Sequence, residues 1–78
     1  MNKIEKKLHR RFMGLSLKKA GTEKEDKLNC LMEFRVILAD IRKDAEAATS
    51  PENEYLNTMI WDIDELLEQC FKIILKML

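Results

Sequence analysis

Apolar residues recur along this chain with the spacing of α-helices. In its middle part they fall alternately three and four residues apart, which predicts one apolar face of a helix over about 23–48. The members of this stripe are Leu31, Phe34, Leu38, Ile41, Ala45 and Ala48. The same spacing continues after Pro51 to the end of the chain and predicts a second long helix over about 51–77. Its stripe consists of Leu56, Ile60, Ile63, Leu67, Cys70, Ile74 and Met77.

A weaker repeat of the same kind marks the first twenty residues and predicts a shorter helix over about 2–19. Its apolar positions are Ile4, Leu8, Phe12 and Leu15. Gly14 lowers helix stability by about 1 kcal/mol relative to Ala, so the helix ends or bends there. We expect this helix to lie across the open end of the two long helices, near Phe71, Ile74 and Leu78.

Residues typical of helix ends separate the three segments. Gly21 suits the position after a helix, and Thr22 with Glu25 three residues later forms a capping box for the next one. Ser50 is the expected N-cap of the last helix, and Pro51 fits its first position because the missing N–H has no partner there. The connection between the long helices is therefore about three residues long.

A connection this short forces neighbouring helices to run antiparallel. The sequence thus predicts an all-α fold, in which a long antiparallel helical hairpin and a shorter basic N-terminal helix form a three-helix bundle in one domain over 1–78. A turn centred near Thr49–Ser50 places Cys30 level with Cys70. The expected filling of the hairpin is a set of small residues near the turn and large ones at the open end: Ala45, Ala47, Ala48, Phe34, Leu67 and Phe71.

Composition agrees with a small helical domain. The 78 residues are 46% hydrophobic and 36% charged, and they include only two Gly and one Pro, which argues against sheets with many turns. No run of 18 apolar residues is present, so we expect no membrane-spanning helix. The first twenty residues lack the apolar core of a secretory signal, which predicts a cytoplasmic protein.

No combination of residues predicts catalysis. His9 is the only histidine, and it lies in a basic segment away from both cysteines, so we expect no enzyme activity, no cofactor and no small-molecule substrate. Asp64 and Glu68 share a helix face, but without histidine they are better explained as solvated acids facing the basic helix than as metal ligands. Cys30 and Cys70 are expected to be reduced, buried and small apolar residues, with a redox or metal role as the alternative and a disulfide geometrically possible but not required.

Charge is distributed unevenly although the whole chain is neutral. Residues 1–20 contain seven basic side chains against Glu5 alone, a net charge of +6, which the rest of the chain balances. The basic face of the first helix is expected to comprise Lys3, Lys7, Arg10, Arg11 and Lys18. This face could pair with the acidic body of the protein or bind nucleic acid, and the second possibility is the main alternative function. An anionic membrane surface is a further but less favoured partner.

The last helix contains more apolar residues than a single contact with its neighbour can bury. A chain of this size commonly gains stability from oligomerisation or from a partner. We therefore expect a homodimer, or a complex with another protein, rather than a self-contained three-helix bundle. The residues expected to make this contact are Met59, Trp61, Leu66, Ile73 and Leu75.

In outline, the predicted architecture resembles small helix-hairpin proteins that act as co-chaperones in bacterial type III secretion or as plasmid copy-number regulators. The resemblance covers architecture only, and no motif matches residue by residue. The function predicted from the sequence is that of a non-enzymatic regulator, adaptor or co-chaperone, which binds through the last helix.

Overall fold

The computed structural model describes residues 2–15 and 24–78. Within them it contains three helices and no strand: α1 (Lys3–Met13), α2 (Lys24–Ala48) and α3 (Glu54–Met77). The all-α class predicted from the apolar spacing is thus confirmed. The predicted capping box at Gly21 and Thr22 lies outside the described residues.

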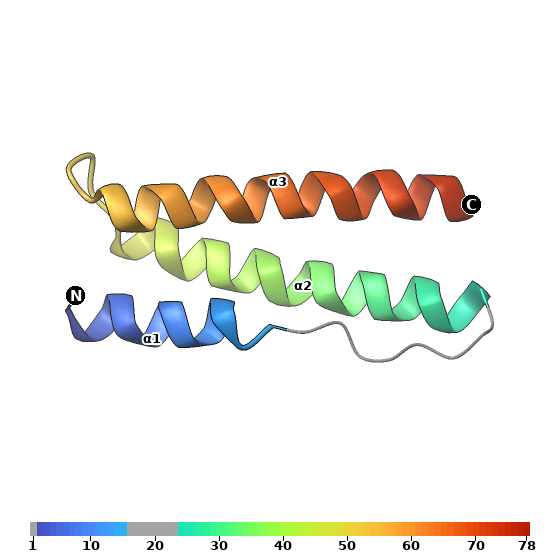
Figure 1. Cartoon of the computed structure of the whole chain (residues 1–78), viewed down its shortest axis with the longest axis horizontal. Coiled ribbons are helices and arrows are strands. Elements are labelled where there is room, and N and C mark those ends of the chain that lie inside the picture. Colours follow the sequence, from blue (N-terminus) through green and yellow to red (C-terminus); the bar gives the residue numbers. More distant parts are fainter. Residues whose placement is uncertain (1, 16–23) are drawn as a thin grey trace.

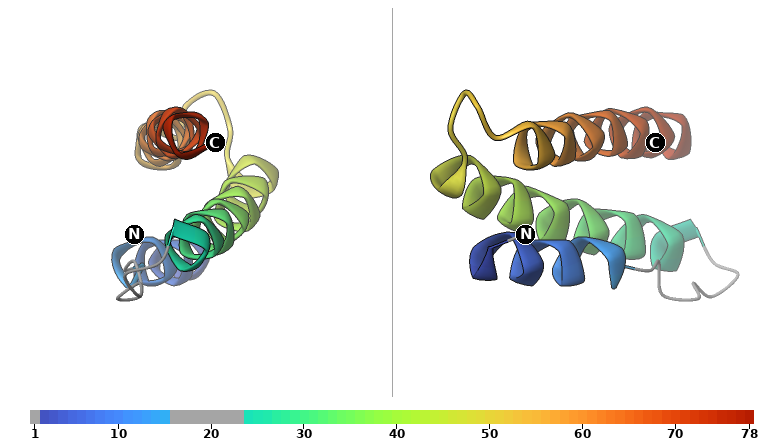
Figure 2. Two further views of the ribbon diagram at one scale, coloured as in Figure 1. Left: turned by 90° about the vertical axis from the view of Figure 1, so that its right-hand side faces the viewer. Right: turned by 60° about the vertical axis from the view of Figure 1, so that its left-hand side comes forward.

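Figures 1 and 2 show how the helices are arranged. α2 and α3 lie side by side and run in opposite directions, and α1 lies along α2 near the connection between α2 and α3. The expectation that the first helix crosses the opposite end, near Phe71, Ile74 and Leu78, is therefore wrong. Instead, the side chain of His9 on α1 is hydrogen-bonded to Tyr55 in the first turn of α3.

The position of α1 follows from where the core lies. Except for Cys70, the buried apolar side chains of the described residues form a single cluster, to which all three helices contribute: Leu8, Leu38, Ile41, Ala45, Leu56, Met59 and Ile63. Leu8 is the only buried residue of α1, and Phe12 and Leu15 pack around it. Ile4 and Ala48, expected in the stripes, are exposed. The half of the α2–α3 pair beyond Ile63 thus has no third helix of the described residues packed on it.

α1 begins and ends at residues with specific contacts. The side chain of Asn2 accepts a hydrogen bond from the Glu5 N–H at 2.8 Å and donates one to the Glu5 carboxylate at 3.0 Å. At the other end, the N–H of Gly14 donates to the Arg10 carbonyl. A Cβ at position 14 would lie 2.9 Å from that same oxygen, so glycine allows the helix to close here. α1 therefore ends at Met13 rather than continuing to residue 19.

α3 begins three residues later than predicted. Its N-cap is Asn53, whose side-chain oxygen accepts from the Leu56 N–H at 3.0 Å, and not Ser50. The Asn53 amide also donates to the Glu5 carboxylate at 3.1 Å, which joins the first turns of α1 and α3. Pro51 lies in a turn of the connection rather than in the helix. The later start lengthens the connection and shifts the pairing of the two long helices.

Side-chain contacts between α2 and α3 fix this pairing. Thr49 donates to the Asn57 side-chain oxygen at 2.8 Å, and Arg42 Nε donates to Asp64 Oδ1 at 2.5 Å. Both pairs are symmetric about Asn53, so the pairing is centred there rather than at Thr49–Ser50. On this register Cys70 lies level with Val36, and Cys30 lies level with Lys76. On this register their levels are six residues apart, about 9 Å along the helices, so it does not support the predicted shared layer of the two cysteines.

Candidate protein-interaction surfaces

Apolar side chains are exposed together at the end of the α2–α3 pair that α1 does not reach. A groove of about 440 Å³ runs between the two helices there, and Val36, Leu67 and Phe71 are the large apolar residues that line it. Val36 is 60% exposed and Phe71 is 51% exposed. Met32 lies one turn before Val36, and Leu75 lies one turn after Phe71. We define these five residues as the distal apolar face: Met32, Val36, Leu67, Phe71 and Leu75.

Local sequence explains why this face is open. Met32 and Val36 are four residues apart on α2 and lie outside the stripe that Phe34, Leu38 and Ile41 form toward the core. The core residues of α2 are fully covered, whereas Met32 and Val36 are more than half exposed. Sequence reasoning about the last helix alone missed both residues. Their i, i+4 spacing beside the main stripe is the signal that could have identified them.

The groove also carries one cation and one anion. Arg35 on α2 and Glu68 on α3 line it together with the apolar residues, and Glu68 Oε1 lies 3.5 Å from the Lys72 ammonium. In the register centred on Asn53, Arg35 on α2 lies opposite Phe71 on α3. Glu68 precedes Phe71 by three residues, so it lies within one turn of the level of Arg35. Closer to the core, Arg42 on α2 pairs with Asp64 on α3, across the contact between the two helices. Arg42 also pairs with Glu46 on its own helix, at 2.9 Å. The hydrogen bond and charge of Asp64 raise the pKa of the Arg42 guanidinium.

The five residues that the sequence predicted as a binding surface do not form one surface. Met59 is only 4% exposed and belongs to the core, and Leu66 is half-buried against that core. Trp61, Ile73 and Leu75 are exposed, with 80% of Trp61 accessible. Ile73 and Leu75 are two residues apart and so point to different sides of α3. Of the predicted set, only Leu75 lies on the distal apolar face.

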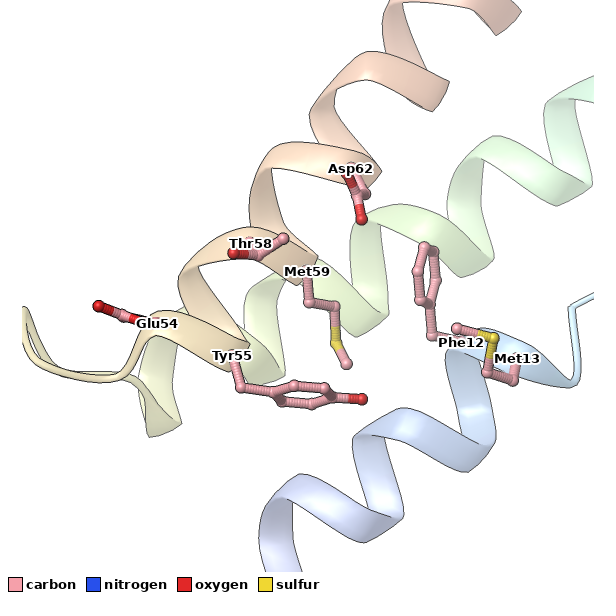
Figure 3. A pocket seen from close by; sticks show the side chains of 7 residues that line it. All are labelled: Phe12, Met13, Glu54, Tyr55, Thr58, Met59 and Asp62. Atoms are coloured by element: carbon pink, nitrogen blue, oxygen red, sulfur yellow. The ribbon is translucent and has the colours of Figure 1, made fainter. Parts of the chain in front are cut away.

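A second groove lies between α1 and α3 and is shown in Figure 3. It has a volume of about 340 Å³, and Phe12, Tyr55 and Met59 point into it from the two helices. Glu54 and Asp62 stand at its rim on α3. An adjoining hollow of about 380 Å³ shares both acids and is bounded by Trp61. Trp61 thus faces solvent beside acidic groups and not beside the distal apolar face.

The basic face of α1 is divided between free and paired side chains. Lys3, Lys7 and Arg10 are exposed. Arg11 turns toward α2, where its guanidinium lies 2.5 Å from the Asp44 carboxylate. Lys18 is outside the described residues. Part of the basic segment therefore contacts the acidic body, while nucleic-acid binding by the exposed lysines and Arg10 stays a prediction.

The acidic residues of α3 do not gather around a common point. Among the described residues, no group of three or more potential metal ligands comes together. Asp64, one of the acids considered in the sequence, is hydrogen-bonded to Arg42 across the seam. Asp62 points to the other side of α3, toward the groove beside α1.

The two cysteines are free thiols in different surroundings. Cys70 is buried, and this burial raises the pKa of its thiol, while the charge of Arg35 lowers it to a smaller extent. Cys30 is half-buried. On the register centred on Asn53, the two cysteines are offset by about 9 Å along the helices, which exceeds the Cα separation of about 7 Å that a disulfide spans.

No helix in residues 2–15 and 24–78 combines the length and apolar content needed to cross a membrane. Compared with models of protein families, with curated proteins and with solved structures, the chain has no significant match. The assignment of a function therefore depends on the surfaces described above.

Proposed function

We propose that the protein is a non-enzymatic helical interaction module that binds a second copy of itself through the distal apolar face. The observation that carries the proposal is the exposure of Val36 and Phe71 on the two walls of one groove. Large apolar side chains grouped in this way are typical of interfaces, whereas single exposed ones are common on any surface. The roles predicted from the sequence, regulator, adaptor or co-chaperone, all act through such binding.

The charges of the groove favour a second copy as the occupant. Arg35 lies on the α2 wall and Glu68 on the α3 wall. A twofold axis parallel to the helices would place α2 of each copy opposite α3 of the other. Arg35 of each copy would then lie within one turn of Glu68 of the other, so the face is complementary to itself in charge as well as in apolar character.

The size of the core supports the same proposal. The main cluster of buried residues lies at the end of the molecule where α1 packs, and beyond it Cys70 is the only buried apolar residue among those the structure describes. A single core in a chain this short contributes only about 3–5 kcal/mol of net stability. Covering Val36, Phe71 and Leu75 in a dimer would extend the apolar interior along the rest of α2 and α3.

Sedimentation equilibrium of the full chain tests this proposal. We expect concentration-dependent dimerisation, and we expect Phe71→Gln to weaken it by at least about tenfold, because each dimer contains two copies of this central residue. Trp61→Gln is the matched control, since Trp61 is exposed on α3 but lies outside the distal apolar face. Equal dimerisation by wild type and Phe71→Gln, or a loss in Trp61→Gln alone, would overturn the proposal.

A further inference from the structure

The surface around the first turns of α3 combines apolar hollows with an acidic ridge. The groove between α1 and α3 and the hollow beside Trp61 share Glu54, Thr58 and Asp62. On one side of this ridge, Phe12, Met13 and Met59 provide an apolar lining, and on the other side stands the indole of Trp61. Glu54 and Asp62 are eight residues apart, about 12 Å along the helix.

The acids of this ridge differ from Asp44 and Asp64 in their partners. Asp44 is paired with Arg11, and Asp64 is paired with Arg42. In the described part of the chain, no ion pair to Glu54 or Asp62 is present. Their negative charges therefore stand beside apolar hollows without a cation from the described residues.

We propose that this surface binds a cationic amphipathic helix of a partner protein. Lysine or arginine side chains about two turns apart would pair with Glu54 and Asp62, and an apolar side chain between them would enter the groove beside Met59. A further cation or aromatic ring would lie against Trp61, whose exposed indole suits both contacts. This proposal is independent of dimerisation, because none of these residues belongs to the distal apolar face.

Charge complementarity selects this partner over an apolar or anionic one. An apolar helix would leave both carboxylates beside an uncharged surface, and an anionic polymer would be repelled by them. A second copy offers Lys3 and Lys7 on α1, but the apolar side chains of that helix, Leu8 and Phe12, are already packed in its own core. The fit is therefore to a separate helix that brings its own apolar face.

The test uses the fluorescence of Trp61, the only tryptophan of the chain. The probe is a synthetic peptide of about 14 residues, roughly four helical turns, built from Leu and Lys in an amphipathic pattern and free of aromatic residues. We expect saturable binding to the full chain with a shift of Trp61 emission to shorter wavelength. Glu54→Gln combined with Asp62→Asn is expected to weaken this binding about fivefold.

A matched variant separates a site from general attraction between opposite charges. Asp40→Asn combined with Glu25→Gln removes the same net charge from exposed positions on α2, and we expect it to change affinity by less than about twofold. Circular dichroism confirms that each variant is helical. Met13→Gln tests whether the apolar lining of the groove between α1 and α3 contributes to peptide binding. Met13 is exposed, so its replacement leaves the core intact.

Three results would overturn the proposal. The first is absence of peptide binding, and the second is an equal loss of affinity in the two charge variants. The third is a concentration-dependent shift of Trp61 emission in the protein alone that Glu54→Gln with Asp62→Asn abolishes. That third result would assign the surface to a second copy of this chain instead of a separate partner.

Discussion

Arg42 and Asp64 join the two long helices, with Arg42 Nε 2.5 Å from Asp64 Oδ1 and a second, longer contact of 3.5 Å from the same guanidinium. Like the contact between Thr49 and Asn57, this pair is centred on Asn53 and marks the register of the two helices. This register brings Val36 and Phe71 to neighbouring levels at the end of the molecule that α1 leaves uncovered. The distal apolar face thus follows from how α2 and α3 are aligned.

Removing the charge of Asp64 should destabilise the protein modestly. Asp64→Asn is expected to lower the free energy of unfolding by about 0.5–1 kcal/mol, because both partners are partly exposed to solvent. Asp62→Asn, on the opposite side of the same helix, should leave stability nearly unchanged. Urea unfolding of the two variants makes the comparison, and equal stabilities would contradict a role for Asp64 in the seam.

The cap of α3 gives a second comparison of paired variants. Asn53→Ala should cost about 1 kcal/mol, because the Leu56 N–H and the Glu5 carboxylate both lose a hydrogen bond. Ser50→Ala should be close to neutral, since the hydrogen bonds at this residue are accepted by its backbone carbonyl. Thermal or urea unfolding measures the stability of both variants. If Ser50 were the cap, Ser50→Ala would lose more stability than Asn53→Ala.

The spacing of apolar residues was sufficient to predict the helices and most of the core. Leu38, Ile41 and Ile63 lie in the predicted stripes and are fully buried, because helical periodicity records which side of each helix is covered. The start of α3 was less predictable. Ser50-Pro51 is a strong start signal, but Asn53 caps the helix equally well and also reaches Glu5, a contact between distant residues that local sequence does not encode.

The candidate surfaces depended on tertiary information to a greater extent. The sequence placed Met59 and Leu75 on one predicted surface, whereas the structure buries Met59 in the groove beside α1 and leaves Leu75 exposed. The position of α1 is likewise a tertiary feature, since Leu8 is the residue of this helix that belongs to the core cluster. Register and packing of distant segments, rather than periodicity, separate the core from the distal apolar face.

Core and surface apolar residues should respond differently to truncation. Ile63→Ala should lower stability by about 2–5 kcal/mol, because Ile63 is fully buried among residues of the main cluster. At protein concentrations where the monomer predominates, Phe71→Ala should cost less than about 1 kcal/mol, since half of this side chain already contacts water. Chemical unfolding at low concentration makes this comparison. A large loss in Phe71→Ala would place Phe71 in the monomer core.

The burial of the Cys70 thiol predicts that the folded protein loses stability at alkaline pH. Burial raises the pKa of its thiol in the folded protein above the ordinary value of 9.0, so the folded state keeps a proton that the unfolded chain releases. The contribution of this group is therefore complete below pH 9.0 and declines as the pH rises toward its folded pKa.

Unfolding of wild type and Cys70→Ala, measured at about pH 8 and about pH 10, isolates this effect, because other titrating groups are common to both proteins. At the higher pH, the free energy of unfolding of wild type should fall relative to that of Cys70→Ala. A pH-independent difference for Cys70→Ala would be inconsistent with the burial of its thiol.

The mass of the wild-type protein in solution tests the central claim most directly. Light scattering over a wide range of concentration should show the mass rising from that of one 9.2 kDa chain to that of two, at both low and high salt, because apolar contact contributes most of the association. A mass of 9.2 kDa at every concentration would mean that the distal apolar face stays exposed in solution, and would contradict the proposal that it binds a second copy.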